Sequence, residues 1–170
     1  MLLHPVGILL PCGHRRRDVG LVKEGVDCAL RGGESSDSRL VARHVGDLRL
    51  VLCAAPQYID RYGLPGVPDD LPHHQQAGYV AASTGTVRPV TLMRDGRTLE
   101  FEVPARFVTT DSAASVSAGL DGMGLVVLAE FVAGHCLASG ALVRVLPGWH
   151  CPPLPLHLLT LTTRLPPIHT

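Results

Sequence analysis

The sequence predicts an α/β fold with a mixed β-sheet, and three observations support this prediction. Residues 107–131 read as a strand, a helix and a second strand in close succession, as in α/β proteins. Asp95-Gly96 separates two apolar segments, VTLMR and RTLEFEV, in the manner of a two-residue hairpin turn. Long strand patterns at 40–55 and 154–163 flank the middle block, so we expect two lobes with a ligand cleft between them.

Local patterns predict the elements of the first half. Residues 1–17 carry no clean period, whereas VDCALRGG further along predicts a short strand that ends in two glycines. Residues 40–55 predict a strand that is half buried at first and fully buried later, because alternating apolar residues give way to a solid apolar run. Pro56 stands at a permitted first helical position, so we expect a short helix that ends before Gly63. The proline-rich residues 64–74 read as an exposed connection with one short turn.

The second half continues with the same two element types. GYVAAS, residues 78–83, predicts a strand, and the hairpin at Asp95-Gly96 follows it. Residues 130–139 predict a helix that Gly140 terminates. Two further strands are expected at LVRVL and, after a run of prolines, at LHLLTLTT.

Residues 107–131 carry the first functional hint. Either Thr110 or Asp111 can accept a hydrogen bond from the first free amides of the predicted helix, and Gly122 can end that helix in a left-handed conformation. The unbroken apolar run 125–129 is typical of a parallel strand that is buried on both faces. A ligand carboxylate at the start of the helix would meet unpaired N–H groups and the positive end of the helix dipole.

Composition excludes several classes of function. The chain has 170 residues, 15 basic and 15 acidic, so it lacks the basic excess expected of a nucleic-acid-binding protein. Its five cysteines are odd in number and form no CxxC, which favours a reducing, cytoplasmic setting and no structural zinc. The N-terminal apolar run is short and precedes an arginine cluster, the reverse of a secretory signal. No segment is long enough for a membrane helix, so we expect a soluble protein that does not bind membranes.

Motifs for catalysis and cofactors are weak. GLDGMG closes a helix and opens a strand, whereas a dinucleotide-binding loop does the opposite. No serine lies in a GxSxG context or has a recognisable base partner, and the nine histidines are scattered without metal-ligand spacing. We therefore expect no catalytic residues, no metal and no cofactor.

Three polar clusters remain as candidates for binding a small molecule. They are Arg31-Gly32-Gly33-Glu34 and Ser83-Thr84-Gly85, which follow predicted strands, and Thr109-Thr110-Asp111-Ser112 at the predicted helix start. Ligands of open α/β sheets bind beyond the carboxyl ends of strands. Each cluster alone is more often a cap or a turn, but the three together would form a polar binding site.

Several sequence blocks, in order, resemble the effector-binding domain of LysR-type transcriptional regulators. The blocks are EGVDCALRGG, LVARHVGDLRLVLCAAPQYIDRYG, PDDLPHH, GYVAASTG, the Thr110-Asp111 helix and GLDGMGLVVLAEFVAGHCLASGALVRVLPGW. The resemblance covers roughly residues 18–163. It implies a two-lobed fold like that of type 2 periplasmic binding proteins, with two crossing hinge strands and an incomplete first lobe. The predicted division is an unmatched segment at 1–17, a partial first lobe and hinge strand at 18–53, a second lobe at 54–150, and a return strand and truncated tail at 151–170.

The resemblance also implies a function. Arg31, Gly32, Ser83, Thr84, Gly85, Thr110 and Asp111 would line or border a cleft that binds a small-molecule effector. Family members carry an N-terminal winged helix-turn-helix that this chain lacks, so we expect that the chain cannot bind DNA alone. Partners would be a second copy in a homo-oligomer or an intact regulator in a mixed oligomer. The alternative is a stand-alone solute-binding protein of the same fold, and an enzyme ranks third. The truncated first lobe is expected to expose apolar surface.

Overall fold

A computed structural model describes residues 28–33, 40–80 and 84–161 of the chain. These residues divide into two compact units. The first contains residues 28–33, 40–47 and 155–161, and the second contains residues 48–80 and 84–154. The units change at Asp47 and at Leu154, whereas the predicted lobes change at 53 and 150. The difference arises because the strand after Leu48 packs inside the core of the second unit.

The first unit is built on a three-stranded sheet. Its strands are β1 (Cys28–Gly32), β2 (Leu40–Leu48) and β10 (Leu154–Leu161), in the order β1-β10-β2. β1 and β10 are antiparallel, with Cys28 opposite Thr160 and Gly32 opposite Leu156. Gly33 follows β1 with a φ of 87°, and its N–H donates to the carbonyl of Pro155 over 2.7 Å. The predicted strands at both ends of the chain therefore pair with each other.

The second unit is organised around β3 (Leu50–Ala54). β3 pairs antiparallel with β8 (Val126–Ala129) on one side and with β9 (Val143–Arg144) on the other. A parallel bridge between Gln76 and Leu125 continues the pairing to β4 (Gln76–Tyr79), which pairs parallel with β7 (Ala105–Thr109). The hairpin β5 (Val90–Arg94) and β6 (Arg97–Phe101) forms a separate two-stranded sheet.

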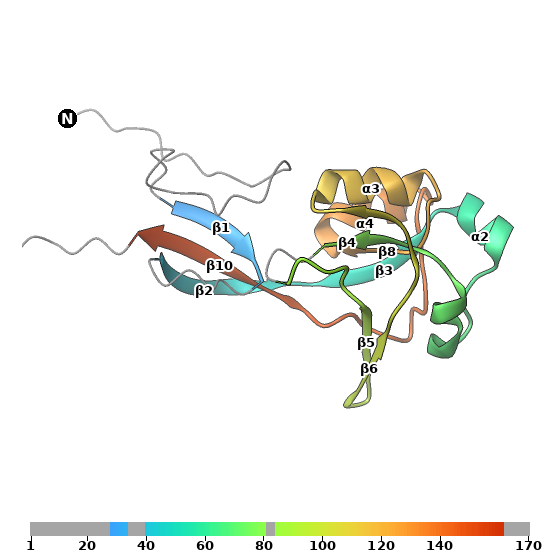
Figure 1. Cartoon of the computed structure of the whole chain (residues 1–170), viewed down its shortest axis with the longest axis horizontal. Coiled ribbons are helices and arrows are strands. Elements are labelled where there is room, and N and C mark those ends of the chain that lie inside the picture. The colour runs from blue at the N-terminus through green and yellow to red at the C-terminus, as the bar shows by residue number, and fades with distance from the viewer. Residues whose placement is uncertain (1–27, 34–39, 81–83, 162–170) are drawn as a thin grey trace, which may run out of the picture. The chain divides into compact units, whose positions relative to one another are not determined.

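Both faces of β3 are buried, because different elements cover them (Figure 1). On one face, Val51 and Cys53 pack with residues of β8 and beneath α3 (Ser112–Leu120) and α4 (Glu130–Ala138). On the other face, Leu52 and Ala54 pack with the β5–β6 hairpin and α2 (Pro56–Tyr62). Alternation of side chains across a strand thus feeds two hydrophobic clusters from one five-residue segment.

Local signals at the helix ends are confirmed in the structure. α2 begins at Pro56 and stops before Gly63, which has a φ of 83°. α3 ends before Gly122, with a φ of 66°. At the hairpin turn, Asp95 and Gly96 have φ values of 50° and 75°, the positive values that a type I′ turn requires.

Other expectations are corrected by tertiary pairing. The apolar run 125–129 is typical of a parallel strand, yet β8 is antiparallel to β3, and the parallel bridge to Gln76 of β4 is formed by Leu125, the residue before β8. Residues 64–74 are not simply exposed, because the 3-10 helix η1 (Pro68–His73) buries Leu71 completely in the core. The long strand 40–55 is interrupted at Arg49. β4 begins at Gln76, two residues before the predicted strand, and the last residues of that prediction, 81–83, lie outside the described part.

In the described part of the chain, no helix has the length and apolar character needed to cross a membrane.

Candidate functional site

The start of α3 is held by a compact set of hydrogen bonds around Asp111. The Oδ1 atom of Asp111 accepts from the backbone N–H groups of Ala113 and Ala114, over 2.7 and 3.0 Å. The N–H of Asp111 donates to Oγ1 of Thr109 over 2.9 Å, and the buried Ser115 hydroxyl donates to the carbonyl of Asp111 over 3.2 Å. Asp111, and not Thr110, is therefore the capping residue of this helix.

This cap changes the chemistry expected at the helix start. A ligand carboxylate was predicted to meet free N–H groups there, but the Asp111 carboxylate already accepts from two of them. The carboxylate also places a negative charge where an anionic ligand would have to bind. The Asp111 carboxylate at the start of α3 can therefore accept a hydrogen bond from a ligand, and its negative charge disfavours the binding of an anion.

Parallel pairing brings a second predicted cluster to the same edge of the sheet. β4 and β7 are parallel, with Tyr79 opposite Thr109, and Val80 donates its N–H to the carbonyl of Thr109 over 2.8 Å. Thr84 and Gly85 come after β4, and Thr110 and Asp111 come after β7. Both clusters thus follow the carboxyl ends of neighbouring strands, the usual position of binding residues in α/β sheets.

Some hydrogen-bonding groups of the loop after β4 are already paired within the loop. Oγ1 of Thr84 lies 2.8 Å from Oγ1 of Thr86 and accepts from the Thr86 N–H over 3.3 Å. Gly85 has a φ of 70°, a conformation that favours glycine. Both residues are exposed, whereas Ser83 lies outside the described residues. Thr84 is available to a ligand through its exposed hydroxyl, although Thr86 competes for it.

Arg31 and Gly32 lie in the other unit, on β1. Arg31 is opposite His157 of β10, and Gly32 is opposite Leu156. Nδ1 of His157 lies 3.1 Å from the carbonyl oxygen of Gly33, the next residue along the chain. Arg31 is half-buried and Gly32 is exposed.

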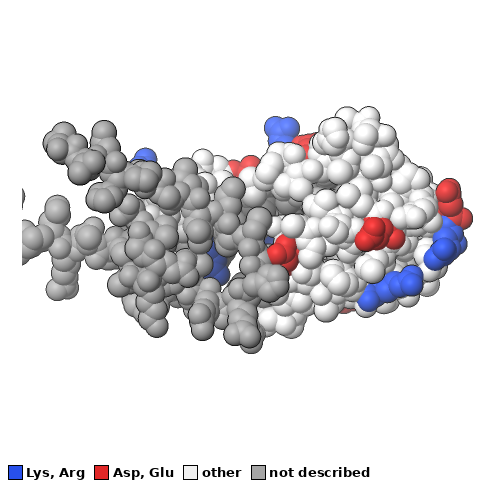
Figure 2. Space-filling view, turned by 90° about the horizontal axis from the view of Figure 1, so that it is seen from above, with Lys and Arg blue, Asp and Glu red and all other residues white. Residues whose placement is uncertain are grey.

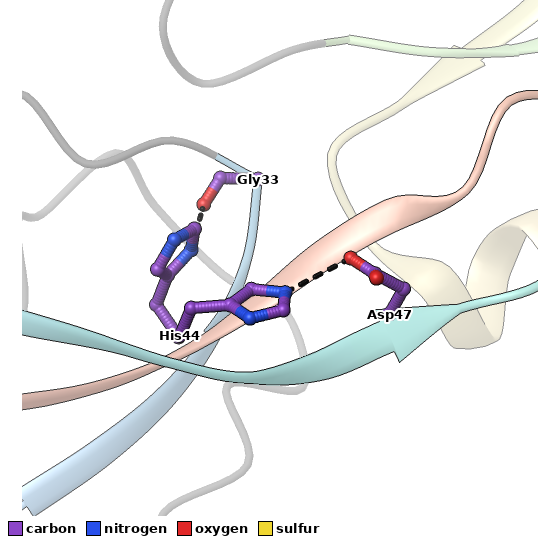
Figure 3. A network of polar contacts seen from close by, with 4 residues as sticks. Gly33, His44 and Asp47 are labelled. Carbon is purple, nitrogen blue, oxygen red and sulfur yellow. Dashed lines mark hydrogen bonds and ion pairs between the residues drawn. The ribbon is translucent and has the colours of Figure 1, made fainter.

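A polar network that the sequence did not indicate surrounds this end of β1 (Figure 3). Nε2 of His44, on β2, lies 3.0 Å from Oδ1 of Asp47, and the rings of His44 and His157 meet edge to face with centroids 5.6 Å apart. More than one hundred residues separate the two histidines in the chain, so no local pattern joins them. Only the pairing of the strands reveals the network.

Among residues 28–33, 40–80 and 84–161, no group of three or more His, Cys, Asp or Glu side chains is arranged to hold a metal ion.

Comparison with known proteins identifies the family of the chain. The model of the LysR substrate binding domain matches residues 6–169, so the match extends into the N-terminal segment 1–17, which was expected to match nothing in the family. An uncharacterised HTH-type transcriptional regulator of Escherichia coli, YhjC, is 31% identical over 167 residues, covering 94% of this chain and 53% of that protein. CrgA of Neisseria meningitidis is 30% identical over 75% of this chain and 42% of its own length. The chain spans about half the length of the curated relatives it matches.

Solved structures agree with this result. The regulatory domain of CrgA, described as a LysR-type transcriptional regulator, superposes with a TM-score of 0.70 at 28% identity, covering 87% of this chain and 72% of that domain. The regulatory domain of AphB from Vibrio vulnificus superposes with a TM-score of 0.65 at 26% identity, covering 85% and 70%.

Proposed function

The chain belongs to the LysR substrate-binding domain family, and from this premise we propose that it senses a small-molecule effector for a transcriptional regulator. The observation that carries the proposal is the family match over residues 6–169, since it takes in nearly the whole chain. DNA binding would then reside in a helix-turn-helix domain of a longer or associated protein. We further propose a cytoplasmic setting and assembly into oligomers, as a homo-oligomer or with an intact regulator.

Thr84, Gly85, Thr110 and Asp111 are the residues of the second unit that we propose contact the effector. Their support is the shared sheet edge after β4 and β7. Because Asp111 already satisfies the first amides of α3, we infer that the effector presents a hydrogen-bond donor or a cationic group to this edge. Ser83, Arg31 and Gly32 stay predictions of the family resemblance.

The effector would act by stabilising one conformation of the regulator over another. A ligand shifts such an equilibrium only by the difference between its affinities for the two conformations. A stand-alone solute-binding protein is not favoured, because the relatives and structural neighbours are regulators. The chain is proposed to be a sensor and not an enzyme.

A thermal-shift screen of small amines, neutral polar molecules and carboxylates tests this proposal. We expect at least one amine or neutral donor to raise the melting temperature of the chain, and Asp111→Asn to weaken its binding by about tenfold. Asparagine is itself a good helix cap, so this variant removes the charge and largely keeps α3. Asp95→Asn, in the hairpin turn, is the matched control.

Two results would contradict the proposal in different ways. Stabilisation by carboxylates alone, undiminished in Asp111→Asn, would overturn the inferred ligand class and leave effector sensing standing. The absence of any stabilising compound across all three classes would count against effector binding by this chain.

A further inference from the structure

A small hollow lies in the second unit and is lined by none of the residues assigned to the effector. It has a volume of about 90 Å³ and is lined by Gln57, Arg61 and Tyr62 of α2 and by Asp121 and Gly122 at the end of α3. Drug-sized sites usually exceed roughly 300 Å³, so this hollow accommodates only a few heavy atoms. In Figure 2, positive and negative side chains lie next to each other at the right-hand edge, the end at which Figure 1 places α2.

One wall of the hollow is cationic. The Tyr62 hydroxyl accepts a hydrogen bond from Nη1 of Arg106 over 3.2 Å. Hydrogen bonding from Arg61, followed by that from Arg106, holds the pKa of the Tyr62 phenol below its ordinary value. The ring of Tyr62 is supported by the buried ring of Tyr58, with the centroids 4.8 Å apart. The Tyr62 phenol thus lies in cationic surroundings, with Arg106 bound to its oxygen and Arg61 next to it in the chain.

Another part of the lining, at the end of α3, is anionic. Asp121 follows the last turn of α3, where the helix dipole is negative. Gln57 donates from Nε2 to the carbonyl of Leu120 over 2.9 Å, which holds α2 and the end of α3 together. Gly122 packs tightly here, because a Cβ atom at this position would lie 2.8 Å from Cγ of Gln57. These contacts hold together the two backbone segments that carry Arg61 and Asp121.

The two walls do not neutralise each other. Arg61 and Asp121 line the same hollow but are not an ion pair within 4.0 Å, and neither pairs with another charged residue in the described part of the chain. A guest that satisfies both walls must carry a carboxylate for Arg61 and the Tyr62 hydroxyl, and an ammonium group for Asp121. We propose that this hollow binds a small zwitterion, a free α-amino acid with a short side chain.

Amide NMR of the full chain with L-alanine as the probe tests the proposal. We expect saturable shifts of the Gly122 amide and the Gln57 side-chain amide, with a Kd in the millimolar range. Acetate and methylamine each satisfy one wall only, so they should bind at least about tenfold more weakly.

Substitutions on each wall separate the two contacts. Arg61→Gln and Asp121→Asn should each weaken L-alanine binding by about tenfold, since each leaves one charge of the guest unpaired. Arg97→Gln and Asp95→Asn on the β5–β6 hairpin are matched controls that should leave the Kd unchanged. All four positions are exposed, and a dispersed amide spectrum shows that a variant is folded.

Three outcomes would overturn the proposal. The first is no shift at Gly122 with L-alanine at tens of millimolar. The second is acetate binding as tightly as L-alanine, which would mark the hollow as a site for anions alone. The third is shifts confined to residues 110–112, which would place the amino acid at the proposed effector residues instead. A failure here leaves effector sensing untouched, because the two sites share no residue.

Discussion

β2 and β3 follow each other directly in the chain but lie in very different surroundings. All but the first residue of β3 are buried, whereas β2 has no buried residue, and its Val41 and Val45 remain 50% and 49% exposed. Both strands contain apolar residues, so hydrophobicity alone does not explain the difference. β3 is covered on both faces by helices and a hairpin, and this second layer makes its apolar residues a core.

The largest effect should come from removing a core side chain of β3. Leu52 is 3% exposed and belongs to the cluster beneath the hairpin, so Leu52→Ala should lower the free energy of unfolding by about 2–5 kcal/mol. Val45→Ala on β2 should change it by less than about 0.5 kcal/mol, because this side chain is already half exposed. Urea denaturation measures both. Equal losses in the two variants would show that β2 is as well packed as β3.

A second pair of substitutions tests the close approach of β8 and β4. Gly124 precedes β8, and a Cβ atom there would lie 2.6 Å from the carbonyl oxygen of Gln75. Gly124→Ala should therefore destabilise the chain by about 1–3 kcal/mol. Gly134 lies within α4, and a Cβ atom added there would meet no atom of another element within 4 Å, so Gly134→Ala should stabilise the chain by about 0.5–1 kcal/mol. Thermal unfolding of the two variants should shift in opposite directions, and a shift in the same direction would refute the packing argument.

The smallest effect concerns two buried cysteines, Cys53 within β3 and Cys151 shortly before β10. Burial raises the pKa of Cys53 from 9.0 to about 12 and that of Cys151 to about 11. At pH 8 these thiols should react with iodoacetamide far more slowly than the half-buried Cys28 and Cys136, because the thiolate is the nucleophile. Mass spectrometry of alkylated peptides measures the rates.

The same shift has a consequence for stability. The folded state disfavours the thiolates of Cys53 and Cys151. Their neutral thiols therefore contribute fully to the free energy of unfolding below pH 9, and this contribution is lost as the pH rises from about 9 toward 12. Cys53→Ala and Cys151→Ala should each reduce this alkaline loss. A chain whose unfolding free energy stays constant above pH 9 would contradict the burial of these thiols.

The sequence by itself determined the local elements and the family. Pro56, Gly63 and Gly122 mark helix boundaries, and Asp95-Gly96 marks the hairpin, because each is set by the backbone conformation of one or two residues. Asp111 was one of two predicted caps for the same reason, since a helix cap is a contact between residues close in the chain.

Tertiary structure alone decided the pairing of strands and the chemistry of the candidate sites. An apolar run such as 126–129 indicates a buried strand, but it does not indicate whether the neighbouring strand is parallel or antiparallel. The network of His44, Asp47 and His157 and the hollow between Arg61 and Asp121 each join segments far apart in the chain. The chemistry of the helix start at Asp111 was also decided by the folded structure. The sequence suggested an anion site there, but the Asp111 carboxylate accepts hydrogen bonds from the N–H groups of Ala113 and Ala114 that an anion would need.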